Sequence, residues 1–171
     1  SAHYSAIRWM QCAGLANGYA DGTFGKFEDS ARAETMSFLY RYLEDTPFTA
    51  DGQTFPDVPA TNTHFIPIEW GSAEDIVRGY ADGTFKPWRD VTRGEFASLL
   101  YRASDVDYTA PATSDFTDVS PASSHYAAIQ WMASEGISVG YRDGTYRAGR
   151  DISRGEMATL IQRFDALVAQ G

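Results

Sequence analysis

A seven-residue sequence occurs three times in this chain at a constant interval. GYADGTF occupies residues 18–24 and again 79–85, and GYRDGTY occupies 140–146. The same interval brings further residues into line, among them one His, one Trp and two Arg in each copy. A fixed period of this length indicates one supersecondary unit that is used repeatedly. We therefore predict three modules, at residues 1–48, 49–110 and 111–171, that together form one folded unit.

Composition limits the classes of partner. With 43% hydrophobic residues the chain has enough apolar side chains for a packed core. The formal net charge of −9 argues against a nucleic-acid partner, which would require a basic surface. No apolar run approaches the roughly 20 residues of a membrane-spanning helix, so we expect no membrane insertion. The single Cys12 has no partner for a disulfide within the chain.

Each repeat is predicted to contain two helices joined by the GYxDGTF loop. In the third copy Tyr126, Ile129 and Met132 lie at helical spacing, and in the second copy Phe96 and Leu100 do so after the loop. A helix commonly ends at a glycine with positive φ. We therefore place the end of each first helix at the glycine that opens the loop, namely Gly18, Gly79 and Gly140.

The predicted fold is mainly α-helical. One helix–loop–helix repeat has too little core to be stable by itself, so the copies must pack together. We expect three repeats arranged as a pseudo-threefold trimer, a spindle with the second helices in a central bundle. The segments 44–58 and 105–121 are rich in Pro, Thr, Asp and Gly and are predicted to be connecting loops.

The second and third repeats begin with a further shared motif. FPDV occupies residues 55–58 and FTDV occupies 116–119. The first repeat has no counterpart, because the equivalent residues would precede residue 1. The first module is therefore predicted to start incomplete.

Taken together, these motifs resemble the S-layer homology (SLH) domains of bacterial surface proteins. The resemblance rests on the GYxDGTF loop, the TRGE or SRGE start of the following helix, the aromatic-rich first helix and FxDV, and it covers essentially the whole chain. It implies a pseudo-trimeric helical spindle at the bacterial cell surface, as part of a larger surface protein. It also implies non-covalent binding to a secondary cell-wall polysaccharide, often through pyruvylated N-acetylmannosamine, in the grooves between modules.

Three equivalent arginines begin the second helices, at Arg32, Arg93 and Arg154. A capping box of Thr92 and Glu95 would put Arg93 in the first helical turn, where a cation faces the positive end of the helix dipole. One explanation is a carboxylate, such as that of a pyruvate ketal, held jointly by the guanidinium and free backbone N–H groups. The other is a structural ion pair with a loop aspartate, Asp82 or Asp90 for Arg93. The resemblance favours the ligand contact.

The first copy departs from this pattern. Its helix start reads DSARAE, with Ala31 where Thr92 and Ser153 stand. The missing side-chain cap should cost about 1 kcal/mol. We therefore expect Arg32 to be the least well placed of the three arginines, and a site that uses it to be weak or empty.

Other repeated residues have both an architectural and a binding interpretation. Each loop aspartate can bond its own backbone two residues on, or can accept sugar hydroxyls; these are Asp21, Asp82 and Asp143. The tryptophans of the first helices can pack in the core or stack on a sugar, and these are Trp9, Trp70 and Trp131. Trp88 and the loop tyrosines, Tyr19, Tyr80 and Tyr141, are further candidates for sugar contact.

No catalytic, metal or cofactor site is predicted. The chain lacks a recognisable nucleophile–base pair, P-loop or nucleotide-binding motif. One histidine per module is more typical of packing at a helix entry than of a metal site. Three similar weak sites suit binding by avidity instead. The alternative is a structural or protein–protein interaction module without glycan binding. On the binding hypothesis, Arg93→Ala and Arg154→Ala should leave folding nearly intact and weaken binding to cell walls.

Overall fold

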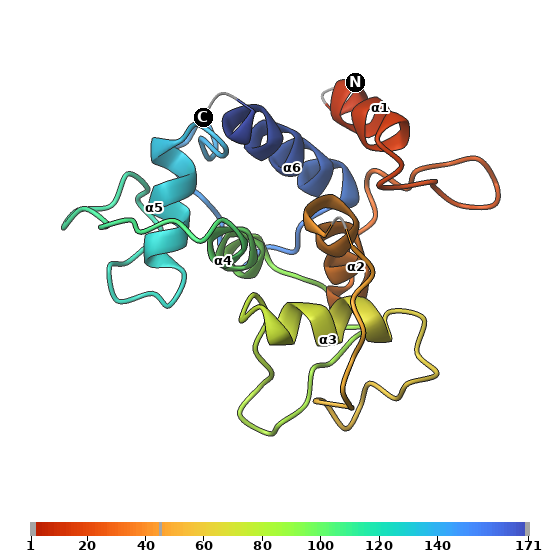
Figure 1. Ribbon diagram of the computed structural model, residues 1–171. Helices are drawn as coiled ribbons and strands as arrows, with labels where there is room; N and C mark the ends of the chain where they lie inside the picture. Colours follow the sequence, from red (N-terminus) through yellow and green to blue (C-terminus); the bar gives the residue numbers. More distant parts are fainter. Residues whose placement is uncertain (1–2, 45, 170–171) are drawn as a thin grey trace.

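The computed structural model describes residues 3–44 and 46–169, so the predicted module ends at residues 1–2 and 170–171 lie outside the described part, as does residue 45. Figure 1 shows a mainly helical chain. Its helices are α1 (Tyr4–Cys12), α2 (Arg32–Leu43), α3 (Phe65–Ala73), α4 (Arg93–Ala103), α5 (Tyr126–Ser134) and α6 (Arg154–Val168). The predicted helical class is confirmed, and each repeat contributes two helices.

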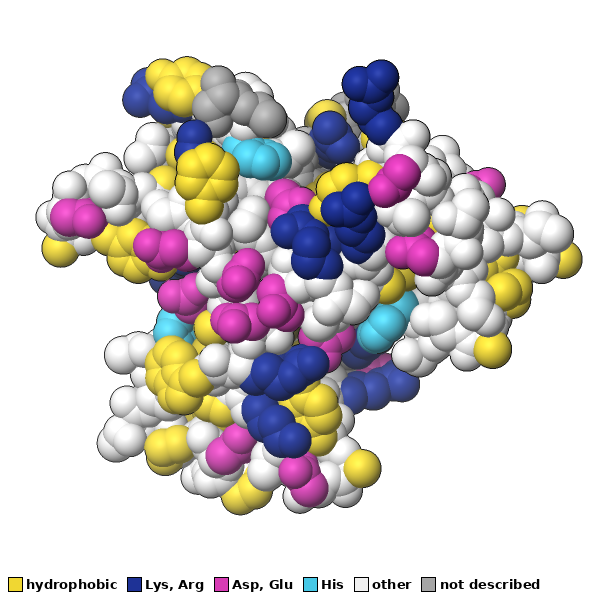
Figure 2. Space-filling model, turned by 180° about the vertical axis from the view of Figure 1, so that it is seen from behind, with side chains coloured by type: hydrophobic (Ala, Val, Ile, Leu, Met, Phe, Trp, Pro, Cys, Tyr) yellow, Lys and Arg dark blue, Asp and Glu magenta, His cyan; other side chains and the backbone are white. Residues whose placement is uncertain are grey.

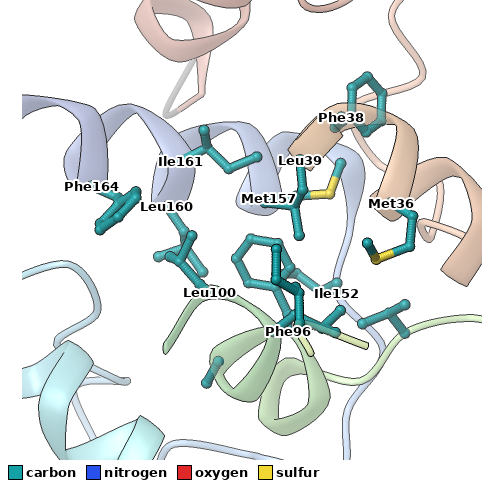
Figure 3. Close-up of a cluster of buried hydrophobic side chains, with 14 of the residues drawn as sticks. Met36, Phe38, Leu39, Phe96, Leu100, Ile152, Met157, Leu160, Ile161 and Phe164 are labelled. Atoms are coloured by element: carbon teal, nitrogen blue, oxygen red, sulfur yellow. The ribbon is translucent and has the colours of Figure 1, made fainter. Parts of the chain in front are cut away.

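The core lies between the second helices of the three repeats. Figure 3 shows apolar side chains of α2, α4 and α6 pointing toward one another. Several are fully buried, namely Met36 and Leu39 from α2, Phe96 and Leu100 from α4, and Met157 and Ile161 from α6. Each such side chain contributes roughly 1.5–3 kcal/mol when removed from water. The second helices therefore contribute to one buried apolar cluster, and their arrangement as a central bundle stays a prediction.

The first helix of each repeat does not pack against the second helix of the same repeat. Instead α3 packs against α2, α5 against α4, and α1 against α6. The two helices of one repeat are therefore joined by the loop, as predicted, but do not form a packed hairpin. The reason lies in the loop between the two helices, which folds against the preceding second helix and so carries its own second helix away from the first.

A closed set of backbone hydrogen bonds joins the three repeats at the starts of the second helices. The N–H of Ser30 donates to the carbonyl of Ile152 (3.0 Å), that of Ile152 to Val91 (2.8 Å), and that of Val91 back to Ser30 (2.9 Å). From each acceptor to its donor, the ring runs from the first repeat to the second, to the third and back to the first, and the helix pairs α2 with α3, α4 with α5 and α6 with α1 follow the same order. The pseudo-threefold arrangement itself stays a prediction, which this cyclic order supports.

The first helices end earlier than predicted. They stop at Cys12, Ala73 and Ser134, and the chain then passes through positive φ at Gly14 (71°), Asp75 (54°) and Gly136 (69°). Gly18 therefore does not terminate a helix. It has φ of 72° within the loop, where an added Cβ would lie 2.5 Å from the carbonyl oxygen of Thr23. The close approach of the Gly18 and Thr23 backbones explains why a glycine opens the motif.

The FxDV motif anchors the loop of its own repeat. The Asp57 carboxylate accepts hydrogen bonds from the backbone N–H groups of Phe85 (2.8 Å) and Lys86 (2.7 Å). Asp118 makes the equivalent pair of bonds to the third loop. Phe85 is fully buried beneath this clamp, whereas its equivalent Phe24 is only half-buried. Within the described residues, no carboxylate makes an equivalent clamp on the first loop.

No described helix has the length and apolar character to cross a membrane.

Candidate ligand-binding grooves

Three grooves of matching composition lie between the repeats. Groove 1 has a cavity volume of ≈ 530 Å³, groove 2 of ≈ 200 Å³ and groove 3 of ≈ 270 Å³. Groove 1 is lined by Arg32, Tyr80, Glu95, Ser98, Arg102 and His125; groove 2 by Arg93, Tyr141, Glu156, Thr159, Arg163 and His3; groove 3 by Arg154, Tyr19, Glu34, Ser37, Arg41 and His64. Each groove thus takes side chains from all three repeats.

The arginine at the start of each second helix is held from two sides. In groove 1 the Arg32 guanidinium carbon lies 4.9 Å from the ring centre of Tyr80 and 4.6 Å from that of Phe85. Its Nε donates to the Phe85 carbonyl at 2.9 Å. Arg93 and Arg154 make the equivalent bonds to Tyr146 and Phe24. Stacking and this bond fix the orientation of a cation that is about 95% buried.

The first two backbone N–H groups of each second helix are already bonded to a neighbouring loop. The backbone N–H of Arg32 donates to the carbonyl of Arg89 (2.9 Å), that of Arg93 to Arg150 (2.8 Å), and that of Arg154 to Glu28 (2.9 Å). The next N–H in each helix is also bonded to the neighbouring loop. The expected carboxylate site made jointly by guanidinium and helix N–H groups is therefore wrong. An anion would have to meet side chains alone.

The predicted ion pairs with loop aspartates are also wrong. Arg93 lies 3.4 Å from Glu156 and Arg154 lies 3.3 Å from Glu34, each a glutamate of another repeat. These glutamates are the third residues of their helices, so the pairs tie one second helix to the next. The expectation that arginine-to-alanine variants fold almost normally is revised accordingly. Each would leave a buried carbonyl without its donor, and Arg154→Ala would also leave Glu34 without its ion pair, at a cost of several kcal/mol.

Capping boxes hold the groove glutamates in the second and third repeats. The Thr92 hydroxyl accepts from the N–H of Glu95, and the Glu95 carboxylate accepts from the N–H of Thr92. Ser153 and Glu156 do the same, whereas Ala31 provides no side-chain cap. Burial raises the pKa of Glu95, but the bonds from Thr92 and Arg89 outweigh it and lower the pKa overall. This carboxylate is therefore ionised at neutral pH.

The repeated histidines line the grooves, a role that sequence reasoning missed. They occupy the N-cap positions of α1, α3 and α5, which confirms the predicted place at the helix entry. Nδ1 of His125 lies 2.8 Å from the Ser98 hydroxyl, and His64 and His3 pair likewise with Ser37 and Thr159. Burial lowers the pKa of His64 and of His125, so both are neutral at pH 7. The sequence signal for this role was their recurrence at the same position of every repeat. The groove glutamates and the second groove arginines (Arg41, Arg102 and Arg163) recur in the same way.

The remaining predicted site residues divide into two groups. All three loop tyrosines line the grooves, with one in each. The loop aspartates do not: Oδ1 of each accepts from the backbone and hydroxyl of the threonine two residues on, as at Asp21 with Thr23 (2.9 and 2.7 Å). Trp70 and Trp131 are 3% and 1% exposed, and Trp9 packs edge-on against Tyr42. Because Trp70 and Trp131 are buried, their indoles are not accessible for stacking on a sugar.

Three carboxylates meet where the repeats join. Oxygens of Asp29, Asp90 and Asp151 lie within 4.8 Å of one another. Figure 2, the view from behind, shows acidic side chains near the middle of the molecule with clusters of Lys and Arg around them. Burial, followed by the charges of Asp151 and Asp90, raises the pKa of Asp29. Each aspartate directly precedes a residue of the closed set of backbone hydrogen bonds, namely Ser30, Val91 or Ile152, and that set brings the three carboxylates together.

Comparison with known proteins gives a consistent picture. The sequence profile of the S-layer homology domain matches residues 54–97 and 115–158. Cell surface glycoprotein 1 of Acetivibrio thermocellus is 39% identical over 163 residues, covering 85% of this chain and 7% of that protein. The cellulosome-anchoring protein of the same organism is 33% identical over 104 residues, covering 58% and 23%. The surface layer protein of Brevibacillus choshinensis is 32% identical over 100 residues, covering 57% and 9%. The chain spans less than a quarter of each relative.

Proposed function

The chain belongs to the S-layer homology family, and from this premise we propose that its grooves bind a secondary cell-wall polysaccharide and anchor a larger surface protein non-covalently. The relatives are, by name, cell-surface, anchoring and surface-layer proteins. We infer the same location for this chain, outside the cell at the bacterial wall. Residues 1–48 are proposed as a third module beside the two matched ones, because they supply the equivalent side chains to the grooves.

The observation that carries the proposal is the shared lining of the three grooves. Each combines an oriented guanidinium, a tyrosine, a serine or threonine hydroxyl and an imidazole. Hydroxyl, imidazole and guanidinium groups bond to sugar hydroxyls, and an arginine also binds a carboxylate through charge-assisted hydrogen bonds. A pyruvylated sugar supplies both kinds of partner. The ligand we propose is therefore an acidic glycan of this type.

Three grooves on one small unit favour binding over catalysis. The groove glutamates recur in every repeat and are engaged in caps or ion pairs: Glu95 and Glu156 in both, and Glu34 in an ion pair with Arg154. A polymer that reaches two grooves at once would gain affinity through effective concentration. We propose that the chain is a binding module and not an enzyme.

A structural role is the second candidate, and one observation favours it. Arg93 and Arg154 each bond both to the carbonyl of a neighbouring loop and to a glutamate of another repeat. These bonds alone would justify the arginines as ties between repeats. The two candidates differ at the half-buried groove tyrosines, whose loss would affect glycan binding more than assembly.

Co-sedimentation with purified cell walls tests the proposal. We expect the chain to pellet with native walls and to stay in solution with walls from which the secondary polymer has been extracted. The double variant Tyr80→Ala/Tyr141→Ala should bind native walls at least about tenfold more weakly. Tyr4→Ala is the matched control, since Tyr4 is 63% exposed and lines none of the grooves. Equal binding to both kinds of wall would contradict the proposal.

A further inference from the structure

The three grooves differ in charge at two positions of the repeat. At the first, groove 1 has Arg78, groove 2 has Val139 and groove 3 has Asn17. Beside this position, the second repeat also has Asp75, which pairs with Arg78 at 2.6 Å and replaces Gly14 and Gly136 of the other repeats. At the second position, Arg89 and Arg150 hold the groove glutamates of the second and third repeats, but the first repeat has Glu28. Groove 1 therefore has the most arginines, although Asp75 neutralises one of them, and groove 3 has the fewest.

The central arginine of groove 1 also lacks the counter-ion that the other two possess. Both carboxylate oxygens of Glu95 accept from Arg89, at 2.7 and 2.9 Å. Within residues 3–44 and 46–169, no carboxylate oxygen lies within 4.0 Å of the Arg32 guanidinium. Arg32 is nevertheless only 6% exposed. A buried cation without a counter-ion is unfavourable, and an anion that enters the groove would relieve that cost.

Groove 3 presents the opposite situation. Its arginine, Arg154, already lies 3.3 Å from Glu34. Glu28 adds a second carboxylate, and the Glu28 carboxylate and the Tyr19 ring both lie against Gly25. An anionic ligand in groove 3 would have to displace one carboxylate and approach another, which like-charge repulsion disfavours.

We propose that groove 1 is the primary site for the anionic group of the glycan and that groove 3 does not bind that group. The proposal rests on the proposed function and assigns it to one part of the molecule. Groove 1 also has the largest volume, ≈ 530 Å³. The assignment reverses the expectation from the uncapped helix start, because the neighbours of Arg32 matter more than its missing cap.

The test uses a defined probe, the methyl glycoside of N-acetylmannosamine with a 4,6-linked pyruvate ketal, and the same glycoside without the ketal. Titration of the chain is followed by calorimetry and by amide NMR shifts. Arg78→Gln removes an exposed groove 1 cation that is paired with Asp75, and leaves that carboxylate without its partner at the edge of the groove. It should weaken binding of the acidic probe about two- to fivefold without disturbing the core. Arg8→Gln, an exposed charge outside the grooves, is the matched control and should change nothing.

A second variant tests whether groove 3 can gain binding of the acidic probe. Asn17→Arg combined with Glu28→Arg gives groove 3 the charges of groove 1, and should add acidic-probe shifts around Tyr19 and His64 that the parent lacks. If the parent binds neither probe, the proposed function fails and the assignment with it. If the parent binds the acidic probe but Arg78→Gln binds equally well, or the parent already shows groove 3 shifts of equal strength, the assignment alone is overturned.

Discussion

Residue 31 distinguishes the first central helix from the other two. Ala31 is the N-cap of α2 and makes no side-chain bond, whereas Thr92 and Ser153 complete capping boxes in α4 and α6. Glu34 already stands at the N3 position that such a box requires. Ala31→Thr should therefore stabilise the fold by about 0.5–1 kcal/mol in urea denaturation. Ser153→Ala should lose a similar amount; a gain of zero at residue 31 would contradict this explanation.

Asp57 shows how one side chain fixes a loop. Its carboxylate accepts two backbone bonds, and the second donor, Lys86, has φ of 57°, a conformation that a lysine seldom adopts. Asp57→Asn keeps the shape but removes the charge, and should lower the free energy of unfolding by about 1–3 kcal/mol. Asp51→Asn, at an exposed loop position, is the control. Similar losses for the two variants in chemical denaturation would argue against the clamp.

Predictions for single residues succeeded where the role depends on neighbours in the sequence, as it does for a helix cap. The capping box at Thr92 was predicted and is confirmed, and Ser153 caps its helix in the same way. The groove histidines and glutamates were visible as repeats, but a repeated residue serves core and site equally well. Each groove is formed by side chains of all three repeats. The sequence of one repeat therefore does not show which of its recurring residues line a groove.

At the scale of elements, the helices could be predicted from their apolar spacing but their pairing could not. The spacing of Ile129 and Met132 indicates a helix whichever partner it packs against. The partner depends on where the loop directs the chain, and here the loop lies against the preceding second helix. The resulting cyclic order means that α1 closes the ring against α6.

Removal of α1 tests this closure. Deletion of residues 1–12 takes away Met10, which is fully buried, and the His3 side of groove 2. Hydrogen exchange should increase mainly in α6, the helix that α1 covers, because exchange follows local loss of packing. The amides of α4 serve as the internal reference. A greater increase in α2 than in α6 would indicate the hairpin pairing instead.

At the scale of the whole molecule, acid should weaken the fold. Hydrogen bonds from Thr145 and Arg147 lower the pKa of Asp143 to about 2, and the pKa of Glu95 is also lowered. A carboxyl group with a lowered folded-state pKa stabilises the fold above its unfolded pKa and loses that contribution as pH falls through the folded value. His64 and His125 act in the same direction below about pH 6.5, since the unfolded chain takes up their protons first.

The free energy of unfolding should therefore decline from pH 7 toward pH 3 in urea titrations at fixed ionic strength. Asp29 opposes the trend, because its raised pKa makes the folded state bind the proton more readily. Asp29→Asn should show a steeper decline than the parent. A stability that stays constant or rises over this range would contradict the assigned pKa directions.

The central claim is that the groove arginines hold an acidic cell-wall glycan. The most direct measurement is an NMR titration of the arginine Nε–Hε signals with polymer fragments released from the wall. We predict that the Arg32 signal moves first and saturates, while the Arg154 signal changes least. Binding that leaves the signals of Arg32, Arg93 and Arg154 unchanged would contradict the account.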